Sequence, residues 1–475
     1  GTGFPNGSTH LANLSVPLAG NLNVNLGASG TVTVAGLNIG AVGGAVTTEV
    51  SSGGAVIVLQ NDFEQDLANA DFNSNAVVDG GDFVLWQRNF PAIGQDITNA
   101  QGDADEDMDV DAADLAIWED NYGLDAIGVA GGQPVITTGG LPGTVNRISA
   151  GVRVINEEVE VIGSTDLTIS GPLSFSDDTP EEGAIGGSIS NTSAGITTTL
   201  SGSVNLTNAF DGGRGDFGLN TSPDAQGRLV VDGVIDDGAN ASDLWIGPGI
   251  NGVRRPLNTV QLNAANTYSG GTKIRRVNLE LGNDAALGTG PVVQSGPSNQ
   301  FGYNIIAVGG PRTLANDITV AQWQTFKGEN SITLTGNITQ TNNRGFVNQL
   351  EEGAVLTLSG LLEIWEDDEA LVREFEFDGE GTTVITGIIR DDPQLSGNDR
   401  RITKSGTGVL RIDVDAGNNT HSGPTVVIMG NLHYADNDSL NTGNGRIVSY
   451  GGAVGVDTGV ANNTVFNAKI DPQSV

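Results

Sequence analysis

Residues 266–272 read Asn-Thr-Tyr-Ser-Gly-Gly-Thr, and residues 419–425 read Asn-Thr-His-Ser-Gly-Pro-Thr. The two segments align without gaps at an offset of 153 residues, and the register continues to residues 287–290 and 440–443. Each copy places a glycine corner between short runs in which apolar and polar residues alternate, as in strands with one buried face. Because one such strand cannot bury that face alone, the repeat predicts a mostly β fold of stacked coils.

This pattern, with the Ala-Leu-Gly-Thr-Gly turn that follows at residues 286–290, resembles the autotransporter-associated β-strand repeat of large bacterial surface proteins. The resemblance is clearest over residues 258–295 and 401–456, and it implies a right-handed parallel β-helix. Looser units of strand, glycine and strand, such as residues 334–338 and 385–389, continue the texture. We therefore expect residues 125–475 to form one β-solenoid.

A second repeat has a period of 32 residues and occupies residues 71–122. Each copy is an acidic loop followed by an apolar run, at residues 83–90 in the first copy and 115–122 in the second. Apolar residues in these runs lie three and four apart, which is the spacing of one helix face. We expect a helix pair over residues 67–124, preceded by a β region at residues 1–66.

The loops carry oxygen-bearing side chains at the spacing that surrounds a calcium ion, with a backbone carbonyl at the seventh position. We expect one or two ions; the alternative is an acidic, solvated loop without metal. The predicted ligands of the first loop are Asp71, Asn73, Asn75, the Val77 carbonyl, Asp79 and Asp82, and those of the second are Asp103, Asp105, Asp107, the Asp109 carbonyl, Asp111 and Asp114.

The sixth position of such a loop needs a positive φ and is usually glycine. Here it is Ala76 in the first loop and Met108 in the second. A left-handed conformation costs a non-glycine residue roughly 1 kcal/mol or more. The sequence therefore leaves open whether both loops are occupied.

Two loop-helix units with Asp at the twelfth position and this period resemble the type I dockerin. The resemblance implies calcium as cofactor and a cohesin-like module as one candidate partner. The tenth and eleventh positions, which dockerins often use for that recognition, are Gly80-Gly81 and Ala112-Ala113 here.

Composition excludes several functional classes. The chain has 57 Asp and Glu against 21 Lys and Arg, a net charge of −36, which repels nucleic acid and anionic lipid. It has no cysteine, so it offers no disulfide, thiolate metal site or cysteine nucleophile. No stretch approaches the roughly 20 apolar residues of a membrane span. The absence of cysteine and the scarcity of lysine favour a secreted or cell-surface protein.

The sequence predicts no catalytic residues, and we expect a protein that is not an enzyme. His421 takes the place of Tyr268 in the repeat, and a position that accepts either residue favours a structural role. The acidic pairs at residues 236–237 and 391–392 follow similar strands, and we expect them to be solvated corners. Nothing brings a nucleophile and an acid together.

The expected function is structural or adhesive, as a calcium-stabilised protein outside the cell. Residues 464–470 read as a strand, and we expect copies of the chain to pair head-to-tail into a surface layer, fibre or filament. The first alternative is a polysaccharide-binding or polysaccharide-degrading β-helix with a dockerin, and the second is an autotransporter passenger fragment. The geometry of assembly, any adhesive ligand, whether the chain is a fragment of a longer precursor, and whether residues 1–66 belong to the solenoid stay open.

Overall fold

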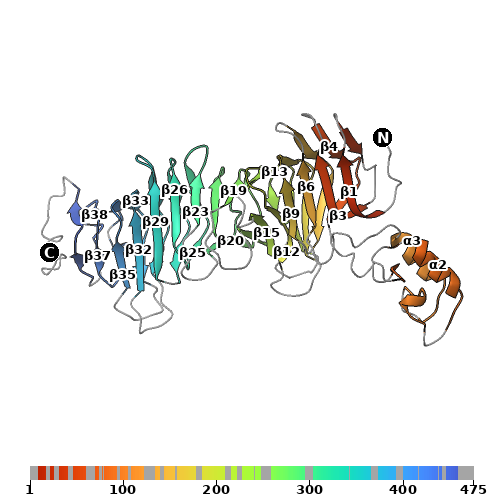
Figure 1. Cartoon of the computed structure of the whole chain (residues 1–475). Helices are drawn as coiled ribbons and strands as arrows, with labels where there is room; N and C mark the ends of the chain where they lie inside the picture. The colour runs from red at the N-terminus through yellow and green to blue at the C-terminus, as the bar shows by residue number, and fades with distance from the viewer. Residues whose placement is uncertain are drawn as a thin grey trace. The chain divides into compact units, whose positions relative to one another are not determined.

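The structure is a computed structural model of the 475-residue chain (Figure 1). It divides into two compact units, Gly1–Gly218 and Leu219–Val475, which are treated separately below. The residues that the structure describes are 9–17, 22–25, 31–40, 47–59, 70–73, 78, 80–93, 97–104, 108–121, 134–139, 144–155, 158–177, 185–208, 216–221, 227–239, 241–247, 258–294, 303–341, 343–364, 373–391, 400–415, 417–436, 438–440 and 445–457.

The first unit is built from two rows of parallel strands. The first row contains β1 (Thr9–Pro17), β3 (Thr31–Gly40), β5 (Val56–Leu59), β6 (Val135–Gly139), β8 (Gly151–Ile155), β9 (Glu158–Gly163), β11 (Leu173–Asp177), β12 (Ile185–Asn191) and β14 (Val204–Asn208). The second row contains β2 (Leu22–Asn25), β4 (Thr47–Ser51), β7 (Val145–Ile148), β10 (Leu167–Ile169) and β13 (Thr197–Leu200). Strand β15 (Asp216–Thr221) crosses the boundary between the units.

Strand pairing shows where the N-terminal β region belongs. Strand β3 pairs in parallel with β6, and β4 pairs in parallel with β7, so residues before the helix pair share sheets with residues after it. The sequence had left this question open. Residues 67–124 therefore interrupt a continuous stack of coils.

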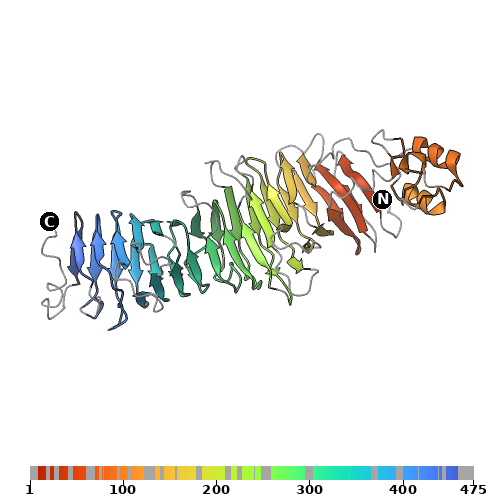
Figure 2. The same ribbon diagram turned by 90° about the horizontal axis from the view of Figure 1, so that it is seen from below.

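The second unit adds a third row of strands. Figure 2 shows the strands of this unit following one another from green to blue. The first row contains β17 (Ile235–Asp236), β18 (Asp243–Ile246), β20 (Gly271–Ile274), β22 (Val292–Gln294), β25 (Ile318–Val320), β28 (Ile338–Gln340), β31 (Leu362–Ile364) and β34 (Ile389–Asp391). The second row contains β16 (Arg228–Val231), β19 (Asn258–Leu262), β21 (Val277–Leu281), β23 (Asn304–Ala307), β26 (Gln324–Gly328), β29 (Arg344–Leu350), β32 (Arg373–Gly379), β35 (Arg400–Lys404), β37 (Thr425–Val427) and β39 (Ile447–Ser449). The third row contains β24 (Arg312–Leu314), β27 (Ile332–Leu334), β30 (Val355–Leu358), β33 (Thr382–Ile385), β36 (Val409–Ile412), β38 (Asn431–Tyr434) and β40 (Ala453–Val456).

Each coil repeats after a short stretch of chain, so equivalent side chains stack into columns. In the second unit Ile318 lies opposite Ile338, and Thr382 lies opposite Val409. The described fold is thus mostly β with long parallel sheets, as expected for a β-solenoid, because neighbouring strands pair in parallel from coil to coil. Alternation along each strand sends every second side chain into the core.

The columns are buried. In the first unit Leu59, Val154, Phe175 and Leu206 stack in register, each at most 1% exposed. Each buried side chain of this size contributes about 1.5–3 kcal/mol relative to an exposed one. Stacked aliphatic columns therefore explain how a chain with few aromatic residues forms a core.

The repeated heptapeptide is a network of buried polar groups that ties coils together. Asn266 donates to the Ala286 carbonyl at 2.6 Å and accepts from the Ile235 amide at 2.9 Å. Tyr268, which is fully buried, shares a 2.6 Å hydrogen bond with the Thr272 hydroxyl. The motif recurs because its asparagine satisfies backbone groups of neighbouring turns that would otherwise be buried without partners.

The helix pair has its own small core. Helices α2 (Gly80–Asn89) and α3 (Ala112–Asn121) flank the short helix η1 (Asn99–Gln101). Phe72, Trp86, Ala104 and Val110 form the buried centre, and Phe83 and Trp118 pack on it. None of the described helices is long and apolar enough to cross a bilayer.

Candidate metal centre

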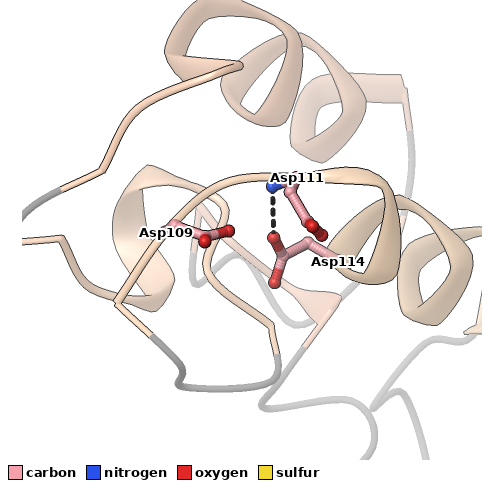
Figure 3. Close-up of side chains that lie close together, drawn as sticks. All are labelled: Asp109, Asp111 and Asp114. Carbon is pink, nitrogen blue, oxygen red and sulfur yellow. Dashed lines mark hydrogen bonds between the residues drawn. The ribbon is translucent and has the colours of Figure 1, made fainter.

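Three carboxylates of the second loop converge ahead of α3 (Figure 3). One oxygen from each of Asp109, Asp111 and Asp114 lies within 4.8 Å of the others. Asp114 is in the first turn of the helix, while Asp109 and Asp111 belong to the loop before it. Like charges this close repel one another unless a cation or protons neutralise them.

Asp114 is the anchor of this group. Its side chain is wholly buried and accepts hydrogen bonds from two loop amides, those of Ala104 at 2.6 Å and Asp111 at 2.7 Å. The two bonds draw the start and the end of the loop onto the first turn of α3. The Asp114 side chain is therefore held in place by hydrogen bonds within the loop.

Asp103 and Met108 define the opposite side of the loop. Asp103 is 2% exposed and accepts a 3.2 Å hydrogen bond from the Met108 amide. Met108 has φ of 74°, the left-handed conformation that the loop spacing requires at its sixth position. This part of the sequence prediction is confirmed. The equivalent Ala76 lies outside the described residues.

The structure differs in detail from the ligand set expected for the second loop. Asp109 was expected to offer its backbone carbonyl, yet its half-buried side chain belongs to the carboxylate group. Asp111 is exposed and also accepts a 2.6 Å hydrogen bond from the Ala113 amide. Asp105 and Asp107 lie outside the described residues.

The first loop is described only in part. Asp71 is 7% exposed and Asp82 is wholly buried. Asp82 accepts a 3.0 Å hydrogen bond from the Asn73 amide, much as Asp114 accepts from Ala104 in the second loop. Asn73 is exposed, and the predicted ligands Asn75, Val77 and Asp79 lie outside the described residues.

The sequence did not identify Trp86 as a residue that supports the metal centre. Trp86 of α2 donates from its indole nitrogen to the Asp111 carbonyl at 2.8 Å. It also packs in the shared core at 8% exposure. Its recurrence as Trp118 at the repeat period was the available signal, but spacing alone does not reveal a bond between the two copies.

The residues of the second loop suit a hard cation of calcium size. Calcium takes carboxylate and carbonyl oxygens at flexible angles. Asp109, Asp111 and Asp114 would hold it; Asp103, also expected as a ligand, is not part of this group. A bound cation would supply positive charge where three carboxylates meet. The fit follows from the mutual distances of the three carboxylates.

The acidic turns of the solenoid have a different role from the one expected. Asp237 is 4% exposed and accepts from the Ser242 amide at 3.1 Å and from the Ser269 amide at 2.7 Å. Asp391 accepts from the Ser422 amide at 2.8 Å, and burial raises its pKa although Ser422 and Arg400 oppose the shift. The expectation of a solvated corner was wrong for Asp237, which is buried, while Asp391 is half-buried. Each carboxylate accepts the amide of one serine of the next coil, Ser269 and Ser422 respectively.

The buried histidine fills a structural position. His421 is wholly buried; its Nδ1 lies 2.8 Å from the Asn419 amide oxygen and its Nε2 lies 3.2 Å from the Thr425 hydroxyl. These partners match the polar network around Tyr268 in the other copy. The ring is therefore held within the chain and faces no site.

Comparison with known proteins assigns no function to this site. No protein-family model matches the chain, and no curated protein and no solved structure was found to be similar to it. The functional conclusion consequently rests on the strands, the carboxylates and the exposed ends themselves.

Proposed function

We propose that the chain is a non-enzymatic, extracellular structural protein whose coils assemble end to end with other copies, and whose acidic helix pair is stabilised by calcium. The assembly would form a surface layer, fibre or filament. The resemblances to the autotransporter-associated repeat, to a right-handed β-helix and to the dockerin belong to this proposal, as do the secreted or cell-surface location and the adhesive role. A cohesin-like module remains a candidate second partner.

The observation that carries the proposal is the apolar last coil of the second unit. Leu410 of β36 and Leu432 of β38 are wholly buried, but Val454, next in their column, is half-buried. Within the described residues no strand pairs with the outer side of β40. Such an edge offers both an apolar column and unpaired backbone groups to another strand.

Large apolar side chains also gather beside that edge. Ile428 and Met429 follow β37 and are 47% and 48% exposed, and Tyr450, after β39, is 71% exposed. A partner that added a coil would cover the open column and extend the parallel ladder. A second copy is a natural occupant because β1 and β2 are likewise the outermost described strands of the first unit.

The junction would be partial. The first unit presents one strand in each of its two rows at the outermost coil, whereas the last coil of the second unit presents β39 and β40. Among the described strands only the second row reaches both ends, so head-to-tail pairing would join β39 of one copy to β2 of the next, while β1 and β40 belong to different rows. The predicted strand at residues 464–470 lies outside the described residues.

Aromatic side chains do not favour the polysaccharide-binding alternative. A sugar platform needs an open ring face, but the ring of Trp245 on β18 is covered by two cations. The Lys273 ammonium lies 4.8 Å and the Arg275 guanidinium 4.3 Å from its centroid. Lys273 is further held by a 2.8 Å ion pair with Asp243.

Electron microscopy of the purified chain tests the proposal. We expect filaments or sheets in calcium, and their loss in the variant Val454→Lys, which places a charge at the end of the apolar column. The matched control is Val234→Lys, at a side chain that is 43% exposed on another turn, and it should assemble normally. Dispersed monomers in calcium, or release of sugars from a polysaccharide, would overturn the proposal.

A further inference from the structure

The helix pair is inserted within a single line of β-structure. Strand β3 is continuous, but its neighbour is made of two strands, β5 and β6. Val34 of β3 lies opposite Leu59, the last residue of β5, and Gly36 lies opposite Val135, the first residue of β6. Residues two apart on a strand are separated by about 7 Å, so the two ends of the insertion are close together.

The same line is interrupted in the following coils. Strand β5 pairs with β8 and β6 pairs with β9, and only residues 156–157 separate β8 from β9. In the next coil β11 pairs with β8 and β12 with β9, with residues 178–184 between them. The break is thus a shared feature of these coils, filled by connections of very different length.

The length of that connection has an energetic consequence. The 75 residues from 60 to 134 must be closed into a loop for β5 and β6 to lie in one line. The equilibrium constant for closing an unstructured loop falls with roughly the 3/2 power of its number of residues. A folded helix pair shortens the loop that must be closed, since the segments that carry Phe72, Trp86, Val110 and Trp118 then share one core.

We propose that folding of the helix pair is coupled to closure of the coil that carries it. Whether the pair is folded or unfolded then sets the stability of the pairing of β5 and β6 with β3. Where calcium folds the pair, this coupling rests on the proposed function and makes the first coils of the solenoid respond to calcium. The coupling itself needs only that the pair can fold and unfold.

Hydrogen exchange on the full chain tests the coupling without using metal as the trigger. Trp86→Ala removes the centre of the helix-pair core and its bond to the Asp111 carbonyl, and α2 should lose protection. The amides of β5 and β6 should then exchange roughly sixfold faster, because the loop to be closed lengthens about threefold. The matched control Val84→Ala, at a side chain that is 46% exposed on the same helix, should change neither.

A second variant keeps the test decisive if Trp86→Ala leaves the pair folded. Replacing residues 60–134 with a short glycine-serine linker should keep β5 and β6 at least as protected as in the full chain. Loss of α2 protection with β5 and β6 unchanged, or loss of β5 and β6 in the linker variant, would overturn the coupling. If chelation changes no amide while Trp86→Ala acts as expected, the calcium part of the proposed function fails and the coupling stands.

Discussion

Two buried carboxylates, Asp114 in the helix pair and Asp237 in the solenoid, show how the same group serves different ends. Both accept backbone amides, and neither is more than 4% exposed. Asp237 is surrounded by donors, the amides of Ser242 and Ser269 and the Ser269 hydroxyl at 3.0 Å. Asp114 shares its surroundings with two further carboxylates. Asp237 is therefore satisfied by donors of the solenoid itself, whereas the helix pair brings three carboxylates together, where we propose that a cation binds.

The largest effect is expected for a substitution in the carboxylate group of the helix pair. Asp114→Ala removes the buried anchor of the carboxylate group, and calcium affinity should fall roughly a hundredfold or more. Fluorescence of Trp86 and Trp118 in the helix-pair core should no longer respond to calcium. The matched control Glu119→Ala removes an exposed charge from the same helix and should leave the response intact. Equal calcium responses in both variants would contradict the assignment.

The next effect should appear in the solenoid and be independent of calcium. Asp237→Ala leaves the buried Ser242 amide and the amide and hydroxyl of Ser269 without their acceptor, which should lower the free energy of unfolding by about 1–3 kcal/mol. Asp237→Asn keeps one carbonyl oxygen and should cost less. Chemical denaturation with and without a chelator provides the measurement, and a calcium-dependent loss would mean that the two regions are not distinct.

A buried amine, Lys404, provides a second test of how the solenoid accommodates a buried charge; its ammonium donates to the Gly406 carbonyl. Lys404 is 2% exposed and stands in register between Phe377 and Val427. Burial lowers its pKa to about 8, although Asp378 and Glu376 oppose the shift. In the unfolded chain a lysine titrates near 10.4, so its charge favours the unfolded state below pH 8 and this penalty fades as the pH rises.

Unfolding measured across pH tests this penalty. The wild-type chain should gain about 1–2 kcal/mol between pH 7 and pH 9.5. Lys404→Met should be more stable at pH 7 by about 1–3 kcal/mol and should lose that pH dependence. The control Lys327→Met, at an exposed lysine, should keep the wild-type profile. A destabilised Lys404→Met would show that the ammonium is needed.

The smallest effect is expected where one repeat copy is given the residue of the other. His421→Tyr restores the aromatic hydroxyl that meets Thr272 in the first copy, and stability should change by less than about 1.5 kcal/mol. His421→Ala should lose about 2–4 kcal/mol, because it leaves a cavity and unpaired polar groups. Thermal unfolding of the two variants checks this order, and its reversal would show that the copies are not equivalent.

Much of the fold could be predicted from local sequence patterns. The alternation and glycine corners around residues 266–272 predicted stacked coils, and the loop spacing predicted the positive φ of Met108. Both follow from short-range geometry, since strand periodicity and loop closure depend on neighbours in sequence.

Contacts between coils were beyond the reach of the sequence. Asp237 looked like a solvent-facing corner because its partner Ser269 is 32 residues away on the next coil. The pairing of β3 with β6 was hidden in the same way, because Gly36 and its partner Val135 are 99 positions apart in the sequence and no local signal links them. The side chain of Asp109 joined the carboxylates because the loop turns at Met108, which spacing alone does not orient.

Calorimetric titration of the full chain with calcium tests the contrast between the two regions most directly. The account predicts saturable binding of one or two ions, abolished or strongly weakened in Asp114→Ala and unchanged in Asp237→Ala. Absence of saturable binding to the wild-type chain, or equal weakening in both variants, would contradict it.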